Sequence, residues 1–155
     1  MKIAEWAVAA APARLVTIGL GSCVAIVLHD PKARIGALAH VLLPAPEGTR
    51  GMEHPGRFPG AAVPRMLDEM RALGAGGAIT ARLVGGASLF GALLSAPGGG
   101  SIGARNIEAS RAALAAAKVR VTGELVGGAA GRSVYFDVAS GRLDVRSMRE
   151  GDRVL

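Results

Sequence analysis

One cysteine is the residue of this chain best suited to covalent chemistry. Cys23 is the single cysteine of the sequence and follows the glycine-bearing run Gly19-Leu20-Gly21-Ser22. Backbone of this kind can place consecutive N–H groups around an anion, as an oxyanion hole does. A lone cysteine is more often an inert apolar side chain, but this setting makes Cys23 a candidate nucleophile, with Gly21 and Ser22 as candidate oxyanion donors.

A hairpin connects this cysteine to a candidate base. The apolar runs Val24–Leu28 and Ile35–Leu43 are separated by a polar segment with Asp30-Pro31, which favours a turn. We therefore predict two antiparallel strands. If the turn is centred directly after the proline, Cys23 lies opposite His40 on one face of the sheet.

An imidazole opposite a thiol could remove its proton, and the resulting thiolate could attack a carbonyl carbon. Without the cysteine, His40 would be interpreted as a hydrogen-bonded core histidine. Thr17 is a candidate third member that orients the imidazole through its hydroxyl or carbonyl. Arg105 and Asn106 could donate to a bound amide, and helix capping by Asn106 or Ser101 is an equal alternative.

The remaining patterns predict a layered fold. Apolar residues at helical spacing indicate a helix around Val63–Leu73, with Pro64 in its first turn and Gly74 as its C-terminal cap. A second, alanine-rich helix should begin near Ser101 to Ala104. Short strands are expected at Ile79–Val84, Val119–Val121, Val134–Val138 and Leu143–Val145, the last three antiparallel. The order predicts an α+β or mixed α/β sandwich, a sheet core covered by two main helices in a single domain over residues 1–155.

Composition narrows the class of protein. The chain has 155 residues, of which 50% are hydrophobic, so it can bury a conventional core. Its net charge of +6 raises the question of nucleic acid, but the basic residues are dispersed and only 3% of residues are aromatic, so we expect none. We expect no metal, no cofactor and no membrane insertion, because the histidines lack ligand spacing, the glycine motifs fit no nucleotide and no apolar run could span a bilayer. Glu5 interrupts the apolar N-terminus, so the cytoplasm is the expected location.

The run Thr17-Ile-Gly-Leu-Gly-Ser-Cys23-Val-Ala, followed by His40-Val-Leu-Leu-Pro44, resembles the chemoreceptor glutamine deamidase family, CheD. Further motifs of that family follow in the same order: Arg57-Phe58, Gly85-Gly86-Ala87-Ser88-Leu89-Phe90, Ile102-Gly103-Ala104-Arg105-Asn106, Gly127-Gly128, Gly131-Arg132 and Phe136-Asp137. The resemblance implies that Cys23 is the nucleophile, His40 its base and Thr17 the residue that orients it. It also implies a fold related to bacterial toxin cysteine deamidases.

The activity implied by the resemblance is that of a protein-glutamine deamidase, a hydrolase acting on linear amides. It would convert specific glutamines in the cytoplasmic helices of chemoreceptors to glutamate, release ammonia and so tune chemotaxis. Chemoreceptors would be partners, and a CheC-type phosphatase is a further implied partner. Esterase activity at the same site is chemically allowed. The alternatives are a non-catalytic adaptor for the receptor or the phosphatase, disfavoured by the intact Cys23 and His40, and an Arg-rich nucleic-acid-binding domain, disfavoured by the dispersed charge.

Overall fold

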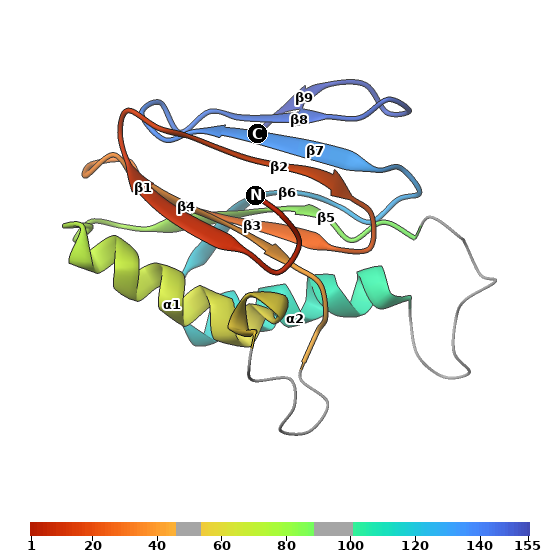
Figure 1. The fold of residues 1–155 in the computed structure, drawn as a ribbon, viewed down its shortest axis with the longest axis horizontal. Helices are drawn as coiled ribbons and strands as arrows, with labels where there is room; N and C mark the ends of the chain where they lie inside the picture. Colours follow the sequence, from red (N-terminus) through yellow and green to blue (C-terminus); the bar gives the residue numbers. More distant parts are fainter. Residues whose placement is uncertain (46–53, 89–100) are drawn as a thin grey trace.

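The computed structural model describes residues 1–45, 54–88 and 101–155, which stack in three layers (Figure 1). Two helices, α1 (Pro59–Ala72) and α2 (Ile102–Ala116), cover one face of a five-stranded sheet. The other face of that sheet packs against a four-stranded sheet. The prediction of an α+β sandwich with a sheet core and two covering helices is confirmed, and the second sheet completes it.

In the described part of the chain, the five-stranded sheet has the order β1-β4-β3-β5-β6. Its strands are β1 (Trp6–Ala10), β4 (Ile35–Val41), β3 (Val24–Asp30), β5 (Thr80–Gly85) and β6 (Arg120–Val126). Every residue of β3 and β4 is buried, because helices cover one face and the second sheet covers the other. Burial on both faces explains why both strands are continuous apolar runs rather than alternating patterns.

The direction of β6 differs from the prediction. The segment around Val119–Val121 was expected to join an antiparallel pair, but β6 pairs with β5 in parallel. The reason is the connection, because α2 lies between these two strands in sequence and returns the chain to the starting end of the sheet. β5, α2 and β6 therefore form a βαβ unit.

The four-stranded sheet has the order β2-β7-β8-β9 over the described residues. Its strands are β2 (Arg14–Leu20), β7 (Arg132–Asp137), β8 (Leu143–Arg146) and β9 (Arg153–Val154). The expected antiparallel pairing of β7 with β8 is confirmed. Sequence patterns missed β1, β2 and β9. The pairing of β2 with β7 is interrupted by a bulge between Thr17 and Leu20, where Gly19 has a φ of 75°.

Helix α1 begins earlier than predicted. It begins at Pro59, and a short 3-10 helix (Pro55–Arg57) precedes it, so Pro64 is an interior residue and not part of the first turn. The hydrogen bond that Pro64 cannot donate would have gone to the carbonyl of Gly60, which is exposed and open to water. Gly74 follows the helix with a φ of 104°, in agreement with its predicted capping role.

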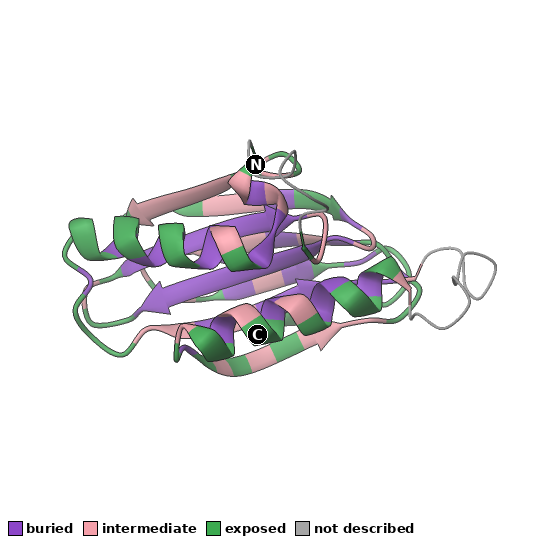
Figure 2. Ribbon diagram, turned by 90° about the horizontal axis from the view of Figure 1, so that it is seen from below, coloured by how far each residue is buried: buried purple, intermediate pink, exposed green. Residues whose placement is uncertain are grey.

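Two apolar clusters fill the spaces between the layers. One lies between the helices and the five-stranded sheet, and Figure 2 shows the buried sides of both helices turned towards the strands. The other lies between the two sheets and includes Cys23, Ala25, Leu38 and Phe136. The candidate nucleophile is therefore part of the layer between the sheets. No helix in the described ranges is long and apolar enough to cross a membrane.

Candidate active site

The turn of the β3–β4 hairpin sets the register of the site. Asp30 pairs with Ile35, which leaves a four-residue loop, and its carboxylate accepts hydrogen bonds from the backbone N–H groups of Lys32 (3.0 Å) and Ala33 (2.9 Å). Because the loop is centred one residue later than expected, the pairing shifts by two positions. His40 faces Ala25, so the prediction that it lies directly opposite Cys23 was wrong.

A shift of two positions keeps side chains on the same face of a sheet. Cys23 immediately precedes β3 and packs with Ala25 and Leu38 between the sheets. His40 lies two residues after Leu38 and therefore faces the same layer. Cys23 and His40 are thus diagonal neighbours, a relation that places Cα atoms roughly 7–8 Å apart and within reach of a long side chain.

The second sheet contributes Thr17. Its side chain is fully buried, and Oγ1 lies 2.7 Å from Nδ1 of His40. The same oxygen is 3.2 Å from the peptide carbonyl oxygen of Met1. The structure therefore brings Thr17 and His40 into contact from opposite sheets, with Cys23 in the same layer.

The loop that carries Cys23 is tied to two other elements. The N–H of Gly86 donates to the carbonyl of Cys23 (2.7 Å), and the N–H of Ala87 donates to that of Gly21 (2.8 Å). Asn106 Nδ2 donates to the carbonyls of Ser22 (2.8 Å) and Leu42 (2.9 Å). The carbonyl groups of the loop are thus committed to its anchors.

Asn106 is fully buried and its amide nitrogen is used to hold the cysteine loop against the end of β4. Arg105, the other residue considered for amide binding, is exposed. The side chain of Ser101 accepts a hydrogen bond from the N–H of Ala104 (3.2 Å), so it is Ser101 that caps α2. Asn106 therefore acts from the helix interior, as a support for the loop.

Glycines allow these elements to approach the cysteine closely. A Cβ atom on Gly85 would collide with the carbonyl oxygen of Cys23, and one on Gly103 would collide with the carbonyl of Gly86. The family motif that starts at Gly85 therefore borders the cysteine loop through Gly86 and Ala87. Leu89 and Phe90 of the same motif lie outside the described residues.

Burial determines the charge state of the pair. Removal from water raises the pKa of the Cys23 thiol, partly offset by its own backbone N–H. Burial also lowers the pKa of His40, and the positive amino terminus adds to this effect. Both groups are therefore neutral near pH 7. Nε2 of His40 is buried and has no hydrogen-bond partner among the described residues.

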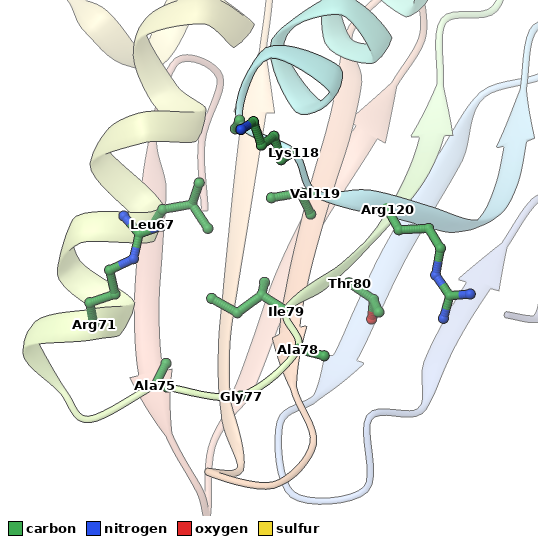
Figure 3. A pocket seen from close by; sticks show the side chains of 12 residues that line it. Leu67, Arg71, Ala75, Gly77, Ala78, Ile79, Thr80, Lys118, Val119 and Arg120 are labelled. Atoms are coloured by element: carbon green, nitrogen blue, oxygen red, sulfur yellow. The ribbon is translucent and has the colours of Figure 1, made fainter.

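A separate cavity of about 510 Å³ lies near the C-terminal ends of the two helices (Figure 3). Its lining includes Arg71, Lys118 and Arg120. Thr80, which also lines it, starts β5, whereas the cysteine loop contacts the segment after the end of β5. The cavity therefore lies at the opposite end of the sheet from Cys23. No group of three or more potential metal ligands occurs within the described ranges.

Comparison with known proteins identifies the family. A family model described as CheD chemotactic sensory transduction matches residues 42–147, which is more than half of the chain. The chain belongs to the CheD family. The match begins after Cys23 and His40, so it rests on the α1, α2 and β5–β8 regions.

Individual CheD relatives extend the similarity over the proposed site. The chain is 39% identical to a probable chemoreceptor glutamine deamidase CheD of Desulforamulus reducens over 147 residues, 94% of this chain and 88% of the relative. It is 43% identical to such a protein, CheD 2, of Geobacter metallireducens over 150 residues, 96% and 92% of the two chains. It is 38% identical to the chemoreceptor glutamine deamidase CheD of Thermotoga maritima over 153 residues, 98% and 93% of the two chains.

Sequence patterns missed how this CheD chain supports its site. Arg132 is buried, donates to the carbonyl of Gly127 (2.8 Å) and pairs with Glu150 (2.7 Å). The N–H of Gly127 in turn donates to the carbonyl of Gly85 (2.8 Å), beside the cysteine loop. The motif Gly131-Arg132 was the available signal, but its contact with Glu150 joins residues that no local pattern links.

Proposed function

We propose that this CheD-family protein deamidates glutamine side chains in the cytoplasmic helices of chemoreceptors, with Cys23 as nucleophile and His40 as base. The relatives carry the name of that activity. The observation that supports the mechanism is the buried, unpartnered Nε2 of His40, on the same sheet face as Cys23 and with Thr17 on the opposite ring nitrogen. A buried polar atom without a partner is costly, and chemistry is one reason to retain it.

The reaction begins when a glutamine side chain reaches Cys23. His40 Nε2 takes the thiol proton as Sγ bonds to the amide carbon, and the carbonyl oxygen becomes an oxyanion. Backbone N–H groups of Gly21 and Ser22 are the candidate donors to it. The proton on His40 then passes to the departing nitrogen, ammonia leaves and a thioester remains.

Water completes the cycle. His40 takes a proton from water as its oxygen attacks the thioester carbon, and the C–S bond breaks. The thiol regains a proton, and the product is glutamate. A neutral thiol and a neutral imidazole suit this sequence, because the thiol still carries the proton that His40 removes as Sγ attacks the amide carbon.

A chemoreceptor cytoplasmic fragment provides the test. Wild-type protein should release ammonia and convert particular glutamines to glutamate, as mapped by peptide mass spectrometry. Cys23→Ala should release none above background while still binding the fragment, because the change removes the covalent step and little contact area. Circular dichroism should show that the variant is folded.

The same experiment separates the adaptor alternative. An adaptor would bind the receptor fragment without ammonia release, and Cys23→Ala would behave like the wild type. Undiminished deamidation by Cys23→Ala would show that another group is the nucleophile. Binding of the fragment by both proteins with deamidation by the wild type alone supports the proposal.

A further inference from the structure

We propose that the peptide carbonyl of Met1 is a positioning group for the base. By accepting the Thr17 hydroxyl proton, it holds His40 in the tautomer that carries its proton on Nδ1 and leaves Nε2 bare. The effect of the Met1 carbonyl on the reaction rate rests on the function proposed above, whereas the tautomer of His40 can be tested without any substrate.

The geometry allows one hydroxyl proton and two neighbours. Thr17 Oγ1 lies 2.7 Å from His40 Nδ1 and 3.2 Å from the Met1 carbonyl oxygen. A hydroxyl has a single proton to donate but two lone pairs that accept. A carbonyl can only accept. If both contacts are hydrogen bonds, the hydroxyl must donate to Met1 and accept from Nδ1–H.

The opposite direction of the hydrogen bond between Thr17 and His40 leaves two polar contacts unsatisfied. If Thr17 donated to Nδ1, its contact with the Met1 carbonyl would lose its proton, and the ring proton would sit on Nε2. Nε2 is buried and has no acceptor within the described residues. A buried N–H without an acceptor has lost its bond to water and gained none in return, and orphaned N–H donors are rarer than incompletely paired acceptors. The Nδ1–H tautomer is therefore favoured.

The N-terminal segment is fixed to the strand of the base. The N–H of Ala4 donates to the carbonyl of His40, and the N–H of His40 donates to the carbonyl of Glu5, both at 2.9 Å. The N–H of Lys2 donates to Glu5 Oε2 (2.8 Å), which closes the turn that presents the Met1 carbonyl. The positioning group is thus held by the backbone of the very residue that it orients.

The chain of donors also favours the protonated base. When Nε2 takes the thiol proton, the charged ring donates from Nδ1 to Thr17, whose hydroxyl donates to the carbonyl of Met1. Hydrogen bonds aligned in this way polarise one another. The relay is uncharged, so it fixes the tautomer without attracting the proton as strongly as a carboxylate would.

The first test is the tautomer in the wild-type protein. Nitrogen-15 NMR of histidine-labelled protein distinguishes a protonated from a bare ring nitrogen, and His40→Gln assigns the signals. His29 is an internal reference of the opposite kind, because its Nε2 lies 3.0 Å from the carbonyl of Val138 and must donate there. We expect the proton of His40 on Nδ1 and that of His29 on Nε2. A proton on Nε2 of His40 in the wild type overturns the proposal.

The second test removes the carbonyl. Deletion of Lys2 and Ile3 joins Met1 to Ala4, whose N–H is fixed on His40, so the carbonyl can no longer reach Thr17. We expect a mixture of His40 tautomers and a roughly 10- to 100-fold lower kcat, the usual cost of losing a partner that orients a functional imidazole. Thr17→Val should have a similar effect. Thr17→Ser keeps the hydroxyl and should restore the Nδ1–H tautomer.

Glu5→Ala provides a milder variant should the deletion prevent folding. Glu5 is exposed, so its removal loosens only the turn that holds the Met1 carbonyl, and the tautomer mixture should still appear. A pure Nδ1–H tautomer and full kcat in the folded deletion variant would overturn the role of the carbonyl. Failure of the wild type to deamidate would instead count against the proposed function, because the NMR result does not depend on activity.

Discussion

Two histidines of one hairpin show how the same residue type takes different roles. His29 and His40 are both buried, and burial lowers the pKa of both. His29 is satisfied, since Nε2 donates to Val138 and the ring stacks edge-on against Phe136 at 5.5 Å between centroids. The buried Nε2 of His40 has no hydrogen-bond partner among the residues that the structure describes. Burial and a lowered pKa are therefore common to both histidines, and the difference between them lies in the hydrogen-bond partner of Nε2.

The two ends of the hairpin also differ in their hydrogen bonds. At the turn, the buried Asp30 accepts N–H groups from Lys32, Ala33 and, across the fold, Gly77 (2.8 Å). At the open end, the hydrogen bonds between segments hold the backbone of the cysteine loop, through the carbonyls of Gly21, Ser22 and Cys23. A buried side chain therefore closes one end, whereas backbone carbonyls anchor the other.

The sharpest test of this contrast exchanges each histidine for glutamine. His40→Gln should lower kcat/KM for receptor glutamines by roughly 10²- to 10⁴-fold, the contribution of a general base. His29→Gln should leave the activity per folded molecule within a few-fold of the wild type but lower the free energy of unfolding, because it disrupts the contacts with Val138 and Phe136. Ammonia release and urea denaturation measure the two effects. Equal activity losses in both variants would end the distinction between the two histidines.

Asp30→Ala tests the closed end of the hairpin. The change removes the acceptor of three part-buried backbone N–H groups, so we expect a loss of about 2–3 kcal/mol in the free energy of unfolding, with the chemistry of folded molecules retained. Asp137→Ala is the matched control, because it removes a turn-closing aspartate that is bonded to Ser140 in an exposed turn. Water can replace those bonds, so its loss should be clearly smaller in the same denaturation experiment.

The stability conferred by Asp30 should depend on pH in a defined direction. Hydrogen bonds from backbone N–H groups to its carboxylate hold the pKa of Asp30 below its ordinary value, and the bond from Ala33 has the largest effect. A carboxyl whose folded pKa is depressed stabilises the protein fully above its unfolded value of about 3.9 and loses that effect as pH falls through the folded pKa. Wild type and Asp30→Ala should therefore converge in stability at strongly acidic pH. A constant difference down to that range would contradict this role.

Asn106→Leu should have a smaller effect on the active end. It removes two hydrogen bonds that hold the Ser22 and Leu42 carbonyls, each worth about 1 kcal/mol, and it loosens the cysteine loop. Activity should fall about tenfold, in line with a cost near 1.4 kcal/mol in positioning. Ser110→Ala is the control, because Ser110 is buried on the same helix but bonds only to the carbonyl of Asn106. Unchanged activity in Asn106→Leu would show that the loop is held by its backbone bonds alone.

The smallest expected effect is on alkylation of Cys23. Because burial raises the pKa of the thiol and lowers that of His40, the resting pair is not an ion pair. The rate of labelling by iodoacetamide should therefore keep rising with pH past the ordinary cysteine pKa of about 8.5, since the thiolate is the reactive form. Near pH 7 it should be a few-fold slower than that of an unburied cysteine. A plateau at acidic pH would reveal a preformed thiolate and imidazolium, contrary to this expectation.

Local patterns were sufficient for the elements with strong periodicity, and they supplied the candidate site residues. The hairpin, both helices and the β7–β8 pair follow from apolar spacing and turn residues, and Cys23, His40 and Thr17 stand out by type and setting. The strands missed have weaker signals. β1 is only partly buried, and β9 is two exposed residues long. Such strands are held by their partners and not by their own pattern.

The sequence determined which chemistry this protein can attempt, because residue types and the acidity of their side chains are properties of the chain itself. The tertiary structure decided the rest. It shifted His40 two positions from the expected register, through a turn whose aspartate also bonds Gly77 from a distant segment. It also placed the hydroxyl of Thr17, from the second sheet, between the ring of His40 and the carbonyl of Met1. Contacts between sheets depend on how twisted layers pack, and no local spacing encodes that packing.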